Sequence, residues 1–397
     1  MRILSITTLY PNVERPTFGV FVENRLRKLA ERPDVQLSVV APVPWFPFRQ
    51  TAFGRYATYA RIPAVECRHG ITITHPRYLQ LPKIGTHVAP LFLYLSLIGH
   101  VRELVKREGD FDLIDAHVYY PDGVAAALLA RTLAKPVAVT ARGTDLNLYP
   151  KRYPLVGRMI ARAAREVSAS ITVCAALREA LIELGADPDH VHVMRNGVDL
   201  ALFRPLDPTV SRRRWKVSRR TLLSVGHLIE RKGHDLVIQA LSLLPDVDLI
   251  ITGDGPEKAR LQHLAARLGI ADRVRFTGVV QHQNLSSLYS AADALVLASS
   301  REGWPNVLLE ALACGTPVIA SHNWGTPEIV SAAEAGLLLD ERTPEAIANA
   351  VRRLFQMPPD RAQTRQFAEA FSWDATTNGQ LRLFSSFLTD DEARPAA

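Results

Sequence analysis

Short apolar runs alternate with helix-patterned segments along most of this chain, and the alternation occurs in two successive series. The first series runs from Arg2–Thr8 to Val191–Arg195, and the second from Leu222–Val225 to Leu337–Asp340. Apolar runs this short are typical of strands buried in a parallel sheet, with each intervening helix making a right-handed crossover. Asn196–Pro205 separates the series, and 397 residues are enough for two domains. The pattern therefore predicts an α/β chain with two parallel-sheet domains.

The segment that follows the predicted strand at Ala294–Ala298 gives the clearest indication of a ligand. After a sharp turn, Pro305 suits the first position of a helix predicted at Asn306–Ala313, which Gly315 ends. Such a helix starts at the carboxyl end of a parallel strand, where open α/β sheets bind ligands. Its free amides, from Gly303 onwards, and its dipole favour an anion such as a phosphate.

Two glutamates accompany this helix start: Glu302 lies in the turn and Glu310 lies within the helix. A carboxylate accepts hydrogen bonds from neighbouring hydroxyls of a diol, while the helix amides hold a phosphate. The arrangement indicates a sugar nucleotide. The alternative is that both glutamates are solvated and only complement the helix dipole.

The string EGWPNVLLEALACGTPVIA, in which seven residues separate Glu302 from Glu310, resembles the signature of the family 4 retaining glycosyltransferases with the GT-B fold. The resemblance extends over nearly the whole chain and is strongest from Asn196 to Val330. It implies two Rossmann-like domains facing across a cleft, with the acceptor-binding domain at residues 1–198 and the nucleotide-sugar-binding domain at 199–372. Residues 373–397 would form a helix that crosses back to the first domain, and a tail.

The resemblance also implies an activity. The chain would be a hexosyltransferase that moves a sugar from a uridine diphosphate sugar to a glycan or lipid-linked acceptor, with retention of anomeric configuration, in cell-surface polysaccharide or glycoconjugate synthesis. The donor is a co-substrate, and neither a cofactor nor a metal is expected. Two Asp-x-Asp strings, at 187–189 and 246–248, lie at strand ends away from the expected ligand edge, so we interpret them as surface turns.

A basic turn, SVGHLIERKGH, follows the first strand of the second series. Fixed cations at such a turn would stabilise a departing diphosphate without a metal. Lys232 matches the lysine of the family's phosphate clamp, which implies a catalytic role for it together with Glu302. The family usually has arginine directly after the first glycine, where this chain has His227, and neutral imidazole is a weaker clamp. Arg231 could substitute for that arginine from a different position.

Glycines after other predicted strands complete the donor site that the resemblance implies. Gly19 would let backbone approach the sugar or phosphate closely, and Trp324 stands where a glycine is common, so the pocket would be narrower. The predicted donor-binding residues are Gly19, His227, Arg231, Lys232, Gly253, Gly255, Gly278, Glu302, Gly303, Trp304, Pro305, Asn306 and Glu310.

His117 ends a predicted strand of the first series and matches a family histidine that contacts the donor sugar. The resemblance implies that it positions the sugar or shares a proton, although a lone histidine is more often structural. Arg142 and Asp145 would lie on the acceptor side. The pair Arg142-Gly143, where the family commonly has His-Gly, is similar to the subgroup that builds polysaccharide in teichuronic acid synthesis.

The net charge of +7 comes entirely from residues 1–200. The segment Trp45–Arg61 is both basic and aromatic, which suits an anionic membrane face or an anionic acceptor. The alternative is a solvated basic loop with some core aromatics. Nucleic acid is not expected as a partner, because no helix-turn-helix, zinc-finger or RNA-recognition motif accompanies the charge.

A cytoplasmic location, peripheral on the inner face of the plasma membrane, is the expected one. Three widely spaced cysteines form neither a disulfide framework nor a metal cluster, which favours a reducing compartment. The N-terminus enters a strand pattern directly, with no signal peptide expected. The longest apolar run, Val88–Ile98, is broken by Pro90 and Ser96 and is too short to span a bilayer.

Three other functions use a similar architecture. A nucleotide-sugar epimerase would form product without an acceptor, and a non-catalytic binding protein would bind the donor without turnover. A nicotinamide-dependent dehydrogenase is disfavoured, because the loop Thr7–Gly19 has a single glycine where a Gly-x-Gly-x-x-Gly would be needed.

Overall fold

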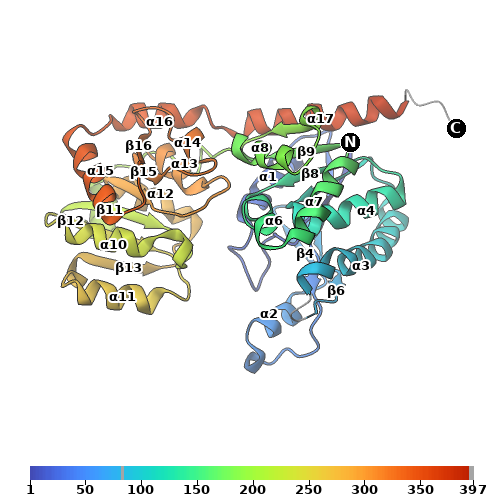
Figure 1. Cartoon of the computed structure of the whole chain (residues 1–397), viewed down its shortest axis with the longest axis horizontal. Coiled ribbons are helices and arrows are strands. Elements are labelled where there is room, and N and C mark those ends of the chain that lie inside the picture. The colour runs from blue at the N-terminus through green and yellow to red at the C-terminus, as the bar shows by residue number, and fades with distance from the viewer. Residues whose placement is uncertain (82–84, 393–397) are drawn as a thin grey trace. The chain divides into compact units, whose positions relative to one another are not determined.

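The structure of the chain is a computed structural model, which describes residues 1–81 and 85–392 (Figure 1). It divides into two compact units. The first comprises Met1–Arg195 with the chain from Ala375 onwards, and the second comprises Asn196–Asp374. The divisions predicted from the sequence, after residues 198 and 372, lie a few residues from these.

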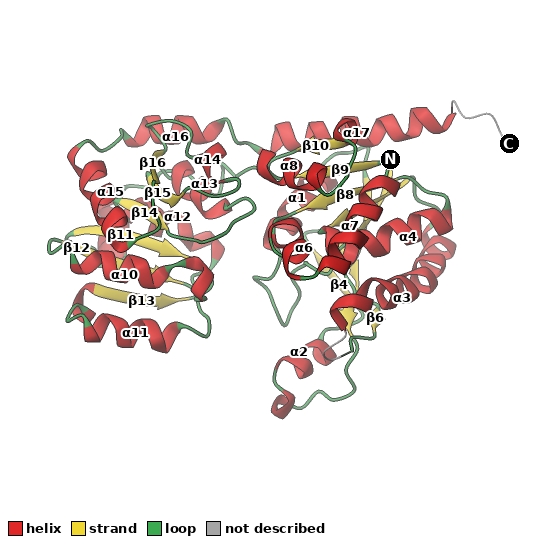
Figure 2. Cartoon of the chain, in the orientation of Figure 1, coloured by secondary structure: helices red, strands yellow, loops and turns green. Residues whose placement is uncertain are grey.

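The first unit is built on an eight-stranded sheet in the order β10-β9-β8-β7-β1-β2-β5-β4, covered by helices (Figure 2). All neighbours pair in parallel except β4 and β5, which form an antiparallel hairpin where the sequence predicted a strand or hairpin. The strands are β1 (Arg2–Ile6), β2 (Gln36–Val40), β4 (Val65–Arg68), β5 (Ile71–Thr74), β7 (Leu113–His117), β8 (Val137–Ala141), β9 (Ala169–Thr172) and β10 (Val191–Val193).

Helices of the first unit occur in the predicted alternation with its strands. They are α1 (Val20–Ala30), α2 (Arg55–Arg61), α3 (Gly85–Glu108), α4 (Val124–Leu133), α5 (Thr144–Asn147), α6 (Tyr149–Arg152), α7 (Pro154–Glu166) and α8 (Ala175–Glu183). Gly19 precedes α1 with φ of 74°, and a Cβ there would lie 2.4 Å from the carbonyl oxygen of Leu9. This glycine is therefore required by the close approach of the two backbones.

The last helix, α17 (Trp373–Glu392), packs mainly with the first unit. Phe384 is fully buried in a core that includes Ile3 and Leu26, and Gln380 is fully buried beside it. The predicted tail at residues 390–397 is helical as far as Glu392, and residues 393–397 lie outside the described part.

The second unit contains a six-stranded parallel sheet in the order β13-β12-β11-β14-β15-β16. Its core includes Leu222, Val237, Ile251 and Val296. The strands are β11 (Arg220–Val225), β12 (Val247–Thr252), β13 (Val274–Gly278), β14 (Ala294–Leu297), β15 (Val318–Ser321) and β16 (Gly336–Leu339). The helices are α9 (Pro208–Arg214), α10 (His234–Ser242), α11 (Lys258–Arg267), α12 (His282–Ala291), α13 (Asn306–Ala313), α14 (Thr326–Ile329), α15 (Pro344–Gln356) and α16 (Arg361–Glu369).

Helix α9 lies within Pro205–Arg220, a polar and basic segment whose composition resembles that of a linker. Asp207 caps this helix by accepting a hydrogen bond from the Val210 amide, and Trp215 donates its indole N–H to Ser287. Helix α15 is capped in a similar way, because Thr343 accepts a hydrogen bond from the Ala346 amide. The basic composition of Pro205–Arg220 does not by itself indicate a helix, and the structure shows that α9 packs on α12.

The segment Pro42–Ala64, between β2 and β4, forms secondary structure of its own. Strand β3 (Val43–Pro44) pairs in parallel with β6 (Arg77–Tyr78), and a 3₁₀ turn at Thr51–Phe53 leads into α2. We call residues 43–62 the aromatic arm. Figure 1 shows it extending away from the sheet of the first unit, beside β6 and α3.

Helix α3 is longer than the apolar run predicted from the sequence. Its 24 residues contain an 18-residue window with mean hydropathy 1.4, of which only 28% is buried, so by length and composition it could cross a membrane. A core helix of a soluble protein passes the same test, and Leu93, Leu97 and Val101 of α3 are indeed fully buried. On the other face Leu91 and Leu95, one turn apart, are exposed.

Candidate functional site

The best-formed polar site lies at the carboxyl edge of the second sheet, between β11 and β14. These strands are neighbours in space, and the chain order reverses on either side of them, which is where open parallel sheets bind ligands. A 3₁₀ turn, Glu230–Lys232, follows β11, and Glu302 follows β14. Lys232 Nζ lies 2.6 Å from Glu302 Oε1, and Arg231 Nη1 lies 3.4 Å from Glu302 Oε2. The structure thus brings together three residues that the sequence predicted for one site.

Glu302 is ionised in this arrangement. Its side chain is only 9% exposed, and burial by itself would raise the pKa of the carboxyl. The charges of Lys232 and Arg231, with the hydrogen bond from Lys232, outweigh that effect and hold the pKa below its usual value. The result is a compact cluster with two cations around one carboxylate.

The loops that carry this cluster are tied to each other through their backbones. The Ser300 amide donates to the carbonyl oxygen of Arg231, and the Arg231 guanidinium donates to the carbonyl oxygen of Arg301 over 2.6 Å. Gly233 ends the turn with φ of 69°, and a Cβ there would lie 2.1 Å from the Ala298 carbonyl oxygen. The turn after β11 therefore has a defined position relative to the loop after β14.

Glu310 lies on α13 and faces a different set of partners. Its Oε2 accepts a hydrogen bond of 2.8 Å from the hydroxyl of Tyr289, and its Oε1 lies 3.7 Å from Nε2 of His282. Tyr289 is fully buried, so it holds the Glu310 carboxylate in one orientation from the protein interior. Sequence reasoning missed Tyr289, because only the packing of α12 on α13 brings the two side chains together.

The start of α13 differs slightly from the prediction. Pro305 is the residue before the helix and not its first residue, and the helix begins at Asn306. Trp304 is 7% exposed, and its indole N–H donates to the carbonyl oxygen of Asn196 over 3.0 Å. Its side chain thus anchors the loop within the unit, so a donor contact from Trp304 would have to come from its backbone. The first amides of α13 have no acceptor within the helix, as at any helix start.

The glycines of the Thr252–Pro256 loop are explained by contacts within the protein. A Cβ on Gly253 would lie 1.9 Å from the carbonyl oxygen of Gly226, and one on Gly255 would lie 2.4 Å from that of Leu228. Backbone hydrogen bonds join the two loops, from Gly226 to Thr252 and from Leu228 to Asp254. Gly278 has φ of 71° but open space around its Cβ position.

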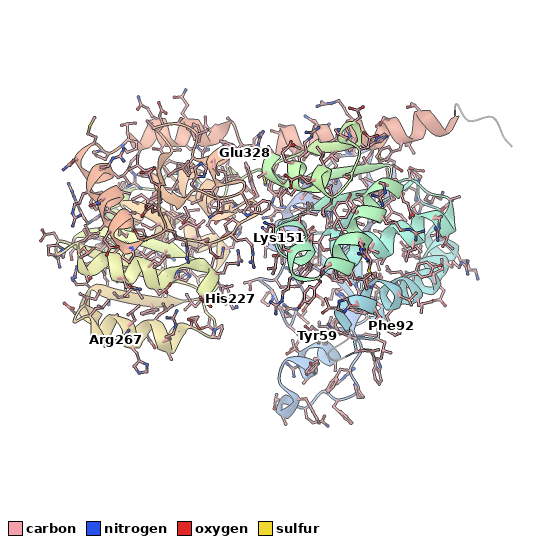
Figure 3. The ribbon with its side chains drawn as sticks, viewed as in Figure 1. Tyr59, Phe92, Lys151, His227, Arg267 and Glu328 are labelled. Carbon is pink, nitrogen blue, oxygen red and sulfur yellow. The ribbon has the colours of Figure 1, made fainter. Side chains whose placement is uncertain are left out.

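Two departures from the family pattern can be located. His227 is exposed on the loop after β11, close to α10 (Figure 3). Arg231 contacts Glu302 from the following turn, which places a guanidinium in the cluster without help from His227. Trp324 has φ of 44°, a conformation that favours glycine, which fits the glycine that the resemblance implies at this position.

His117 lies in the first unit, fully buried at the end of β7. Arg142 donates a hydrogen bond of 3.0 Å to its Nδ1, so the proton of the neutral ring is on Nε2, which lies 3.2 Å from Oδ2 of Asp115. Burial lowers the pKa of His117 more than Asp115 raises it. Gln380 of α17 donates to the same Asp115 oxygen over 3.1 Å and accepts from Arg25 over 2.9 Å.

Asp145, which the resemblance places on the acceptor side, is buried in the structure. It is 2% exposed, and its carboxylate accepts hydrogen bonds from the amides of Tyr119, Arg142 and Gly143. Its role in the structure is to hold the loop after β8. The side chain of Arg142, the other residue of the predicted acceptor pair, contacts the predicted site residue His117.

Comparison with known proteins assigns the family. Residues 18–202 match the model described as Glycosyltransferase Family 4, and residues 210–371 match Glycosyl transferases group 1. A D-inositol 3-phosphate glycosyltransferase of Frankia alni is 32% identical over 365 residues, which are 84% of this chain and 89% of that relative. The chain belongs to glycosyltransferase family 4.

Other similar proteins agree with this family 4 glycosyltransferase assignment. TuaC of Bacillus subtilis, named for teichuronic acid biosynthesis, is 29% identical over 364 residues, 89% of each chain. Among solved structures, a sucrose-phosphate synthase from Thermosynechococcus elongatus has a TM-score of 0.81 at 19% identity and covers 98% of this chain and 100% of its own. Anabaena HepE in complex with UDP and glucose has a TM-score of 0.74 at 20% identity, over 97% and 100% of the two chains. The predicted GT-B fold is confirmed.

Among the described residues of this glycosyltransferase, no group of three or more histidine, cysteine, aspartate or glutamate side chains is placed to hold a metal ion. The first Asp-x-Asp string, 187–189, lies in an exposed turn, as interpreted from the sequence, whereas in the second string only Asp246 lies in a turn and Val247 and Asp248 belong to β12. Asp187 accepts a hydrogen bond from the Asp189 amide, and Asp246 and Asp248 lie near Arg219.

Proposed function

We propose that this glycosyltransferase transfers a hexose from a UDP-sugar to a glycan or lipid-linked acceptor, with retention of configuration and without a metal. The observation that carries the proposal is the cluster of Lys232, Arg231 and Glu302 at the carboxyl edge of the second sheet. HepE, which shares the fold, was solved with UDP and glucose, and this likeness supports a uridine nucleotide.

Each residue of the donor site has a proposed role. Lys232 and Arg231 would stabilise the negative charge that grows on the departing diphosphate, which a metal would otherwise do. Glu302 and the first amides of α13 would hold the sugar, and Glu310, oriented by Tyr289, would hold the ribose hydroxyls. The role proposed for His117 is to position the sugar, and Arg142 at its Nδ1 and Asp115 near its Nε2 would fix the orientation of its ring. Activity that persists in EDTA is expected.

Nucleotide binding tests the donor site. UDP, GDP, ADP and NAD would each be added to the wild type and to Glu310→Ala, and the unfolding temperature measured, since a ligand of the folded form raises it. We expect stabilisation by UDP, its loss in Glu310→Ala, and its retention in Glu341→Ala, a control at an exposed glutamate of the same unit. Stabilisation by NAD alone, or equal UDP effects in all three proteins, would contradict the proposal.

Product analysis then separates transfer from epimerisation. With a UDP-sugar and a panel of glycans, a transferase forms product only when an acceptor is present, and the anomeric proton of the product reports retention. An isomerised nucleotide sugar formed without acceptor would indicate the epimerase alternative. Donor binding without any turnover across the panel would favour a binding protein.

Membrane association on the cytoplasmic face is part of the proposal, in the context of cell-surface polysaccharide synthesis. The aromatic arm exposes Trp45, Phe48 and Phe53, and α7 exposes Arg158, Arg162 and Arg165 along one face. Sedimentation with phosphatidylglycerol vesicles at low and high salt tests it, with Trp45→Ser/Phe48→Ser as the comparison. We expect salt-sensitive binding that the double variant loses. No binding of the wild type at low salt would contradict this proposal.

A further inference from the structure

A cavity of about 310 Å³ lies in the first unit, apart from every residue assigned a role above. It sits at the carboxyl ends of three neighbouring strands, because Thr8 follows β1, Ala41 follows β2 and His75 follows β5. The aromatic arm supplies a further part of its wall through Pro44 and Tyr59. In an open parallel sheet this edge is the usual position of a ligand.

Arg15 gives this cavity a positive charge. Among the described residues that line it, Arg15 is the one side chain with a permanent charge, and none of these residues is an aspartate or glutamate. The guanidinium carbon of Arg15 lies 3.5 Å from the centre of the Phe18 ring and 6.0 Å from that of Tyr59. These rings orient the guanidinium without neutralising it.

Carboxylates near the cavity have other partners. Glu14, the neighbour of Arg15, pairs with Arg61 over 2.7 Å. Glu66 Oε1 lies 3.4 Å from Nε2 of His75, and the other ring nitrogen, Nδ1, contacts the carbonyl oxygen of Ala41. Burial lowers the pKa of His75 more than these contacts raise it, so its ring is neutral and adds no second charge. Arg15 therefore remains the charged group that a ligand would meet.

The remaining lining combines aromatic faces with neutral hydrogen-bonding groups, among them Tyr78, Tyr149, Asn12 and Gln80. Aromatic walls with a few polar groups are typical of small-molecule pockets, and a volume of about 310 Å³ is at the small end of their range. We propose that this cavity binds a sugar ring that carries a phosphate or carboxylate, and that Arg15 binds the anionic group. The inference rests on the proposed function, because it identifies the acceptor as an anionic sugar.

The aromatic arm indicates two sources for the anionic sugar. Its inner side lines the cavity with Tyr59, whereas Trp45, Phe48, Phe53 and Tyr56 are between 40% and 54% exposed. Figure 3 shows Tyr59 at the base of the arm. An anionic sugar could therefore arrive free in solution or as the head group of a lipid under the arm. The chemistry that Arg15 recognises is the same in both cases.

Binding of defined probes tests the proposal in the full chain. Glucose, glucose 6-phosphate and glucuronic acid would be titrated in the presence of saturating UDP, which keeps phosphate groups away from the Lys232 cluster. We expect the two anionic sugars to bind at least tenfold more tightly than glucose, and Arg15→Gln to lose that preference, because a charge-assisted bond is lost. Arg15→Lys should keep part of it, and Arg32→Gln, at an exposed arginine of the same unit, should keep all of it.

A second set of measurements uses phosphatidylcholine vesicles with and without phosphatidylinositol, whose head group is inositol, a sugar-like ring of hydroxyl-bearing carbons, linked to phosphate. Binding to the phosphatidylinositol vesicles that weakens in Arg15→Gln but not in Arg32→Gln would support the lipid source. Equal affinity for glucose and glucose 6-phosphate, with vesicle binding that does not depend on Arg15, would overturn the proposal. UDP stabilisation is recorded separately, so a donor site that fails is distinguished from a cavity that fails.

Discussion

Replacing Lys232 with methionine removes the nearest cation from Glu302 and keeps most of the side-chain volume. At 2.6 Å the pair has about 6 kcal/mol of Coulomb attraction for an effective dielectric constant of about 20. The variant loses less stability than this attraction, because burying neutral methionine avoids the free-energy cost of desolvating the lysine ammonium group. Breaking a buried pair costs about 3–5 kcal/mol. Arg231 stays 3.4 Å from the carboxylate, so we expect about 3 kcal/mol.

Calorimetry of the full chain measures this loss as a fall in the unfolding temperature of the second unit, by roughly 6–12 °C for a domain of this size. The matched control is Lys258→Met. Lys258 is 43% exposed and lies 3.9 Å from Asp254, so its replacement should change the stability by less than about 0.5 kcal/mol. If Lys232→Met unfolded at the temperature of Lys258→Met, the ion pair would have no energetic role and the reasoning would be refuted.

Three other perturbations follow from the described contacts. The pKa of Glu302 is lower in the folded than in the unfolded state, so ionised Glu302 stabilises the fold above its unfolded pKa of about 4.3, and this stabilisation is lost as the pH falls through the folded pKa. The unfolding temperature of Glu302→Gln should therefore decrease less steeply than that of the wild type between about pH 6 and 3. Parallel curves of unfolding temperature against pH would argue against this. Gly253→Ala should have a much lower urea midpoint of unfolding than Gly269→Ala, because a Cβ at Gly253 would lie 1.9 Å from a backbone oxygen whereas a Cβ at Gly269 would meet open space. Equal midpoints for the two variants would contradict the loop packing. Gln380→Leu removes one hydrogen bond from each of two buried charged residues, Arg25 and Asp115, and should destabilise the first unit by about 2–4 kcal/mol in urea unfolding. An unchanged urea midpoint would show that the remaining contacts of Arg25 and Asp115 compensate.

Local sequence patterns were sufficient to predict the organisation of the second unit around α13. A strand, a turn with a proline and a helix stopped by a glycine are determined by neighbouring residues, and they occur at β14 and α13 within a residue or two of their predicted positions. The cluster of Lys232 and Glu302 was predicted through the family resemblance. Its 2.6 Å contact joins residues 70 positions apart, and depends on the pairing of β11 with β14.

Contacts between distant elements account for most of what the sequence did not predict. Tyr289 supports Glu310 only because α12 packs beside α13, and nothing in the helix pattern indicates that neighbour. Asp145 was placed on the acceptor side through the family resemblance, and the sequence did not predict that its carboxylate accepts hydrogen bonds from three amides. The cavity at Arg15 combines segments from three strand ends and the arm, so no single motif encodes it.

The aromatic arm leaves the first sheet after β2 and returns before β4, and β2 pairs directly with β5 across the gap. The eight-stranded sheet is therefore continuous without the arm, and the length and composition of the arm do not affect the register between its strands. Exchange of residues 43–62 between relatives would alter one wall of the cavity and the exposed aromatic surface together. The second unit, with its separate sheet and core, would be untouched. Under the proposed function, exchange of this one short segment would change the acceptor preference and leave donor binding intact.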